Sequence, residues 1–170
     1  EPEARVRKLC EARADPNCQD RNPDFNPDFS SKTFGDRTEH RTPLHYCTED
    51  GDVATMCALI HFRADLDIQD GIMKTPLHIA IEEADVSAVD ILLRSRADVN
   101  LGNRETGSPL MGACLAGDHD LASRLIHARA NINQQGKQGM AAAHLASRRK
   151  DAQLLQILLQ ARADLMQESA

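Results

Sequence analysis

The sequence contains very few aromatic residues and no tryptophan. Phe, Trp and Tyr together make up 3% of its 170 residues, although 41% of the residues are hydrophobic. A large central core usually relies on bulky rings, which bury the most area per residue. The composition therefore favours an architecture of many small aliphatic contacts. No apolar run approaches the roughly 20 residues of a membrane-spanning helix, so no direct membrane insertion is expected.

Sequence signatures of catalytic, cofactor and metal sites are also missing. There is no GxGxxG, GxxxxGK[ST] or GxSxG motif, so neither a phosphate-binding loop nor a nucleophile elbow is indicated. His40, His45 and Cys47 lie close together, but no CxxC or HxxxH pair accompanies them, as a zinc site would require. The adjacent carboxylates Glu82 and Glu83 are expected to be solvated on a helix surface. We therefore expect a protein that is not an enzyme and that holds no cofactor or metal.

The charge and the cysteines argue against two further classes of protein. A net charge of −6 disfavours nonspecific binding to nucleic acid, which needs a basic surface. An odd number of widely spaced cysteines does not suit a disulfide framework, and we interpret them as reduced, buried, small apolar residues. An intracellular, reducing compartment follows, with the cytoplasm as the first expectation and an organelle as the alternative. The cysteines are Cys10, Cys18, Cys47, Cys57 and Cys114.

What the sequence does contain is a unit that recurs at a fixed interval. Its clearest copy runs from Thr75 to Asn100. Other copies start at Thr42, Ser108 and Ala141, so the interval is 33 residues each time (75−42, 108−75 and 141−108). A period of this size indicates stacked supersecondary units rather than one globular core.

Each unit is predicted to hold two short helices. Thr or Ser followed by Pro favours the start of the first helix, because the hydroxyl accepts from exposed amides and Pro has no amide to leave unpaired. This helix should end near Gly51, Ala84, Gly117 or Lys150, and the Asp that follows each of them should cap the second helix. Only a neighbouring unit can bury the paired apolar residues of the second helix. These pairs are Leu59 and Ile60, Leu92 and Leu93, Leu125 and Ile126, and Leu158 and Leu159.

The period and the TPLHxA motif make the chain resemble the ankyrin-repeat family. The residues that carry the match are 42–45, 75–80 and 108–110, with the Ala-Asp-Leu-Asp and Ala-Asp-Val-Asn segments at 64–67 and 97–100. The resemblance implies an all-α solenoid of helix-turn-helix units with hairpin fingers between them. It also implies a structural hydrogen-bonding role for His45, His78 and His144.

The pattern divides the chain, taken as a single domain, into about four repeats after an N-terminal half repeat. An uncapped half repeat would expose apolar surface, so either upstream residues or another element should cover it. The last repeat has Ala141 and Ala142 in place of Thr and Pro, and its first helix should be less firmly started. The predicted segments are a half repeat at 1–20, a finger with an insert at 21–41, and repeats at 42–74, 75–107, 108–140 and 141–170.

Residues 21–37 interrupt the period with a tandem Asn-Pro-Asp-Phe segment. It holds Phe25, Phe29 and Phe34, three of the four phenylalanines in the chain. Three hypotheses stay open: the rings cover neighbouring repeats, they anchor a partner, or the insert is disordered. Ile72 and Met73 are apolar at a predicted finger tip, where they should contact either this insert or a partner.

The family usually has glycine where this chain has arginine after each second helix. Glycine tolerates the left-handed turn at that point. If the turn is kept, arginine should cost on the order of 1 kcal/mol per site, offset in part by the favourable position of a cation at a helix C-terminus. These arginines form a row along one edge of the stack. The row is either solvated and paired with nearby Asp residues, or it is a binding surface for an acidic partner. Its members are Arg13, Arg63, Arg96, Arg129 and Arg162.

The resemblance implies a concave side formed by the fingers and the exposed face of the first helices. Late in these helices the residues run acidic, acidic, apolar and basic. This order predicts a groove whose protein partner presents basic groups to the first two repeats and acidic groups to the last. A fortuitous surface gradient is the alternative. The candidate residues are Glu49, Asp50, Glu82, Glu83, Leu115, Ala116, Arg148 and Arg149, with Arg104 at a finger tip.

Three functions remain open at this point. The first is a protein-interaction module that binds a protein partner through its groove and its Phe-containing insert. The second is an accessory structural subunit of a larger multi-protein assembly, including a membrane or organellar complex. The third is the regulatory ankyrin domain of a longer enzyme or channel.

Overall fold

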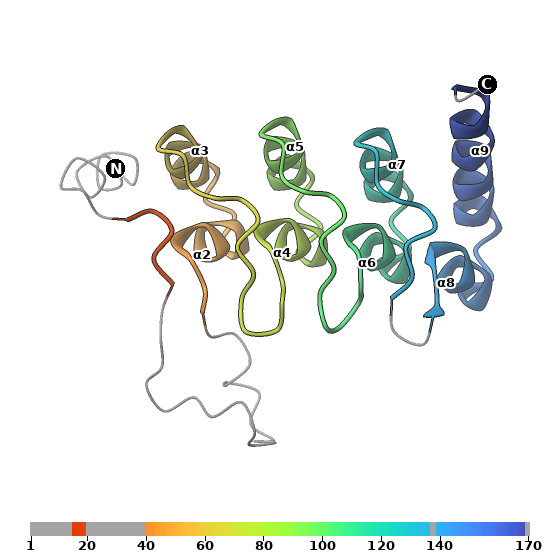
Figure 1. The fold of residues 1–170 in the computed structure, drawn as a ribbon, viewed down its shortest axis with the longest axis horizontal. Coiled ribbons are helices and arrows are strands. Elements are labelled where there is room, and N and C mark those ends of the chain that lie inside the picture. Colours follow the sequence, from red (N-terminus) through yellow and green to blue (C-terminus); the bar gives the residue numbers. More distant parts are fainter. Residues whose placement is uncertain (1–14, 20–39, 137–138, 169–170) are drawn as a thin grey trace, which may run out of the picture.

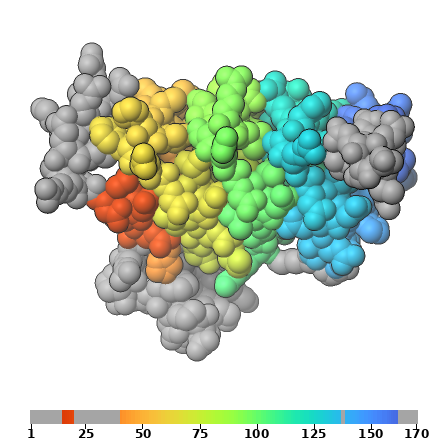
Figure 2. Space-filling model, turned by 45° about the horizontal axis from the view of Figure 1, so that its top comes forward, coloured from red at the N-terminus to blue at the C-terminus, as the bar shows by residue number. Residues whose placement is uncertain are grey.

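Pairs of helices follow one another in a row in the computed structural model, which describes residues 15–19, 40–136 and 139–168 (Figure 1). The pairs lie in chain order along the molecule, and the space-filling view shows them in contact with one another (Figure 2). The all-α solenoid predicted from the sequence is thereby confirmed. The pairs are α2 (Pro43–Glu49) and α3 (Val53–His61), α4 (Pro76–Glu82) and α5 (Val86–Arg94), α6 (Pro109–Ala116) and α7 (His119–His127), and α8 (Ala142–Arg149) and α9 (Ala152–Glu168).

A histidine three residues after the starting threonine links each of the first two repeats to the next finger. The Thr75 hydroxyl lies 2.9 Å from His78 Nδ1, and the Thr75 backbone N–H donates to the same nitrogen at 3.2 Å. Because Nδ1 accepts a hydrogen bond, Nε2 carries the proton and donates to the carbonyl of Gly107 at 3.1 Å. His45 makes the same link to the carbonyl of Lys74 at 3.1 Å.

The last repeat keeps only part of this arrangement. The backbone N–H of Ala141 donates to His144 Nδ1 at 3.0 Å, but alanine has no hydroxyl to add the second interaction. His144 is also exposed, whereas His45 and His78 are buried. The start of α8 is therefore held by fewer contacts than the starts of α2 and α4, as the sequence predicted.

The turns between paired helices lie where the sequence placed them. Gly51, Ala84, Gly117 and Lys150 all have a positive φ, between 52° and 76°. The aspartate that follows each of them caps the second helix. Asp85 Oδ1, for example, accepts from the backbone N–H of Ser87 at 2.9 Å and from that of Ala88 at 3.1 Å.

Left-handed arginines end three of the second helices. Arg63, Arg96 and Arg129 have φ values of 62°, 69° and 70°. The Arg96 amide bonds to the carbonyl of Leu93 at 3.1 Å and the Ala97 amide to that of Leu92 at 3.0 Å, which is the Schellman arrangement. Arginine therefore occupies the conformation that glycine usually takes, so the left-handed turn is kept at these three positions.

The same prediction is wrong for Arg162, while Arg13 lies outside the described residues. Helix α9 runs on to Glu168, so the backbone at Arg162 is helical rather than left-handed. The sequence from 160 to 167 consists mainly of strong helix formers, with no glycine or proline to stop the helix. The motif that ends the earlier helices is therefore not sufficient by itself to end α9.

The core is a continuous apolar layer between the first and second helices of successive pairs. One member of each predicted apolar pair is buried, namely Leu59, Leu92, Leu125 and Leu158. The other members are only half-buried in the first three pairs, and Leu159 in the last is 59% exposed. Each second helix thus turns one face to the stack, which is the pattern that the sequence predicted.

The cysteines do not all follow the sequence interpretation. Cys47 and Cys114 are buried, and burial is the main cause that raises the pKa of each thiol to about 12. Cys18 and Cys57 are exposed, so the interpretation of the cysteines as buried is wrong for these two. Cys57 directly follows the buried Met56 on α3, and the rotation of about 100° per residue turns it away from the core. Cys10 lies outside the described residues.

Candidate functional site

Two ion pairs define a row of side chains along the finger side of the first helices. Arg41 Nη1 lies 2.6 Å from Glu49 Oε2, and Lys74 Nζ lies 2.7 Å from Glu82 Oε2. In both repeats the cation comes directly before the starting threonine. The carboxylate follows eight residues after the cation and is the last residue of the first helix. We call the set of equivalent positions the groove row. It consists of Arg41 and Glu49, Lys74 and Glu82, Gly107 and Leu115, and Met140 and Arg148.

Lys74, the last residue of the first repeat, is shared between two carboxylates of the second repeat (75–107). Besides Glu82, its ammonium group lies 2.8 Å from Oε2 of Glu105 in the next finger. Partial burial acts to lower the pKa of Lys74, but the hydrogen bonds to Glu105 and Glu82 outweigh it and raise the pKa above its usual value. Lys74 is therefore protonated in the neutral pH range and joins the first repeat to the second.

The later part of the groove row carries no ion pair between described residues. Leu115 is half-buried and packs against the core, and Arg148 is exposed. Arg149 donates from Nη1 to the carbonyl of Leu115 at 2.7 Å, and its guanidinium fills the space that a Cβ on Gly117 would need. Arg149 thus neutralises the C-terminal end of α6. Arg148 beside it is exposed, as are Arg149 and Lys150.

Two of the carboxylates late in the first helices are compensated by nearby cations. In the first repeat Arg41 opposes Glu49, and the exposed Asp50 makes no ion pair within the described part of the chain. In the second, the exposed Glu83 follows Glu82, which shares its lysine with Glu105. The charge excess therefore stays negative at the first two repeats, while Arg148, Arg149 and Lys150 make it positive at the last.

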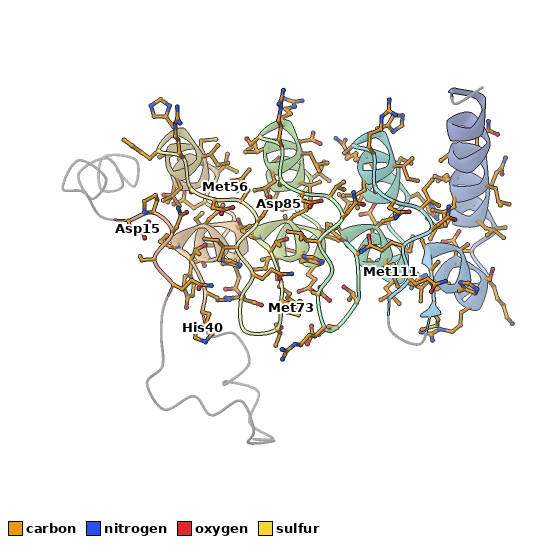
Figure 3. All side chains as sticks on the ribbon, viewed as in Figure 1. Asp15, His40, Met56, Met73, Asp85 and Met111 are labelled. Carbon is orange, nitrogen blue, oxygen red and sulfur yellow. The ribbon has the colours of Figure 1, made fainter. Side chains whose placement is uncertain are left out.

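The remaining candidates lie at finger tips or outside the described residues. Met73 is 39% exposed with a φ of 66°, and Ile72 is half-buried. Met73 lies in the finger between α3 and α4, on the side away from the second helices (Figure 3). The backbone N–H of the exposed Arg104 donates to the carbonyl of Ile72 at 3.1 Å, so two finger tips lie next to each other. The insert residues Phe25, Phe29 and Phe34 lie outside the described part of the chain.

Sequence reasoning missed the cations of the groove row. Arg41 and Lys74 stand at the same position of two repeats, and in both a glutamate follows eight residues later. That recurrence of opposite charges at the repeat period was a usable signal. It was overlooked because residues eight apart are not neighbours on one helix, so only the fold of the finger brings them together.

Neither a metal-binding cluster nor a membrane-spanning helix is found in the described residues. Within residues 15–19, 40–136 and 139–168, no group of three or more His, Cys, Asp and Glu side chains is placed to hold a metal ion. The helices of this part of the chain are all too short or too polar to cross a membrane.

Comparisons with known proteins add one finding. A family model described as ankyrin repeats (3 copies) matches residues 3–103 and 77–169. A search of curated proteins finds no match.

Proposed function

Because this chain belongs to the ankyrin-repeat family, whose members are generally protein–protein interaction modules, we propose that it is a non-catalytic module that binds a protein partner along the groove row. The observation that carries the proposal is the order of charge along that row. In the first two repeats each carboxylate of the row is paired with a cation, and the exposed Asp50 and Glu83 next to it add negative charge. Leu115 is apolar in the third repeat, and Arg148 is exposed in the fourth. A partner of matching charge order would bind in one orientation only.

The physical role of these charges is to orient the partner and to speed its approach. An exposed ion pair contributes only about 0.2–1 kcal/mol, since solvent screens it. Complementary charge over a whole surface acts at longer range and raises the association rate at low salt. The compensated Glu49 and Glu82 contribute less to this field than the uncompensated Asp50 and Glu83. The partner should therefore present basic groups to the first two repeats and an acidic group to Arg148.

A second candidate function, an accessory structural subunit, is favoured by exposed apolar residues on the first and the last of the described second helices. Val53 on α3 is 37% exposed and Leu159 on α9 is 59% exposed. Ends of a solenoid that other subunits cover would keep such residues. In that case the isolated chain should aggregate at micromolar concentration, whereas an independent interaction module should stay monomeric on size exclusion.

Reversal of the charge at Arg148 tests the proposed groove. With a partner captured from cell extract by the wild-type chain, Arg148→Glu should weaken binding about tenfold at low salt and flatten its salt dependence. The matched control is Arg94→Glu, which reverses an equally exposed arginine on the second helix α5. Equal effects of the two variants on partner binding, or no effect of Arg148→Glu, would contradict binding along the groove row.

A further inference from the structure

The finger between α3 and α4, which is the second finger of the chain, holds a buried carboxylate. Only one of the two oxygens of this carboxylate is hydrogen-bonded. Asp70 is 5% exposed, and its Oδ1 accepts from the backbone N–H of Ile72 at 3.0 Å and from that of Lys74 at 2.8 Å. Its Oδ2 is enclosed and has no hydrogen-bond partner among the described residues. A buried acceptor that is left unpaired destabilises the fold, because it has lost its hydrogen bonds to water. Such an atom in a native fold calls for an explanation.

The third finger shows how the same position is satisfied in the next repeat. Asn103 lies 33 residues after Asp70 (103−70), and its Oδ1 accepts from three backbone amides of its own finger. Its Nδ2 donates to the hydroxyl of Thr106 at 3.0 Å, so both polar atoms of the Asn103 side chain are hydrogen-bonded within the finger. The residue equivalent to Thr106 in the second finger is Met73 (106−33), which has no hydroxyl. Aspartate in place of asparagine and methionine in place of threonine together therefore leave one oxygen of Asp70 without a partner.

The surroundings of this oxygen suit the end of a long, positively charged side chain. The carboxylates of Glu82 and Glu105 share the ammonium group of Lys74, the last residue of this finger. The ammonium group of Lys74 is already held by Glu82 and Glu105 and makes no hydrogen bond to Asp70 Oδ2. The finger therefore lacks an internal cation for this acceptor.

Apolar surface lies beside the carboxylate at the finger tip. Met73 is 39% exposed and Ile72 is half-buried. Lysine and arginine pair an aliphatic stem with a charged head, so they can pack along such side chains and still reach an acceptor. Methionine is unbranched and readily changes rotamer, so its movement can open a path to an enclosed atom.

We propose that the tip of the second finger, residues 70–74, binds a lysine or arginine side chain of the protein partner. Asp70 Oδ2 accepts the hydrogen bond of the cationic head, and Ile72 and Met73 pack along the stem. A charge-assisted bond of this kind is stronger than one between neutral groups. The inference rests on the proposed function and deepens it by naming the chemistry of the partner at the first two repeats.

A short peptide serves as the probe. The acetylated, amidated heptapeptide Gly-Gly-Leu-Lys-Leu-Gly-Gly is titrated into the full chain, and amide shifts are followed by NMR. A matched peptide with norleucine in place of lysine keeps the stem and removes the charge. The lysine peptide should shift the amides of residues 70–74, and the norleucine peptide should bind at least tenfold more weakly.

Three variants separate the carboxylate from general surface charge. Asp70→Asn should weaken binding of the lysine peptide at least tenfold. Met73→Thr supplies the hydroxyl found in the third finger, so it should both weaken peptide binding and raise the Tm. The control Asn103→Asp places a carboxylate next to Thr106, whose hydroxyl can satisfy it, and should create no new binding at the third finger. Wild-type affinity in Asp70→Asn, or shifts centred away from residues 70–74, would overturn the inference.

The captured partner distinguishes a failure of this inference from a failure of the proposed function. A partner that loses affinity with Arg148→Glu but binds Asp70→Asn like the wild type would overturn the finger site and leave the groove standing. A partner that loses affinity with both variants supports both. Thermal unfolding of each variant shows that a loss of binding does not come from a loss of folded chain.

Discussion

Replacing Leu92 with alanine is expected to lower the free energy of unfolding by about 3 kcal/mol. Leu92 is 0% exposed on α5 and belongs to the apolar layer that neighbouring repeats share. The substitution removes apolar area from the core and leaves a cavity that the short, tightly joined helices of the stack can only partly close. Urea unfolding followed by circular dichroism measures the effect as a shift of the midpoint at constant slope.

The matched control for this experiment is Leu159→Ala. Leu159 is the partner of the buried Leu158 on α9 and is 59% exposed. The same chemical change should therefore cost less than about 1 kcal/mol there, because little of the side chain leaves an apolar environment. Similar losses in the two variants would mean that burial between repeats is not what stabilises the chain.

Acidification is expected to destabilise the chain through His78. Burial, the largest cause, lowers the pKa of His78 from 6.5 to about 4, helped by the charge of Lys74 and opposed by the hydrogen bond to Gly107. Folded His78 thus stays neutral down to about pH 4, whereas the unfolded histidine takes up a proton near pH 6.5. The unfolded chain binds more protons in this window, so stability falls as the pH is lowered through it. The shift corresponds to about 3 kcal/mol.

His78→Gln provides the reference, since it removes the titrating ring while other groups still titrate. The wild type should lose about 3 kcal/mol more than this variant between pH 7 and pH 4, measured as the free energy of unfolding in urea. Below pH 4 the difference should level off, because both states of the wild type then carry the proton. Parallel pH profiles of the two proteins would show that His78 does not control acid stability.

The sequence predicted the helix pairs because their signals are local and recur. Thr75 followed by proline starts a helix, Asp85 caps the next one, and the ends at Ala84 and Arg96 need only the left-handed turn. The period then assigns these roles to the other repeats without any knowledge of the tertiary structure. The failure at Arg162 has the same origin, because the motif was transferred although the surrounding residues favour a continuous helix.

The site was less predictable because its interactions join separate elements. The charge order along the first helices could be read directly, but the pairing of Glu49 with Arg41 depends on how a finger folds against a helix. Asp70 was overlooked for a similar reason. Its unpaired oxygen becomes visible only by comparison with Asn103 and Thr106, after the hydrogen bonds of both fingers are known. Whether a buried polar atom finds a hydrogen-bond partner depends on the residues that the fold places around it, so composition and spacing do not reveal it.

Amide hydrogen exchange with and without the captured partner tests the central claim, that the partner lies along the groove row. The account predicts slower exchange in residues 70–74 and 103–107 and at the C-terminal ends of α4 and α8, with α3, α5 and α7 unchanged. Protection confined to α3, α5 and α7 would place the partner on the opposite side and contradict the account.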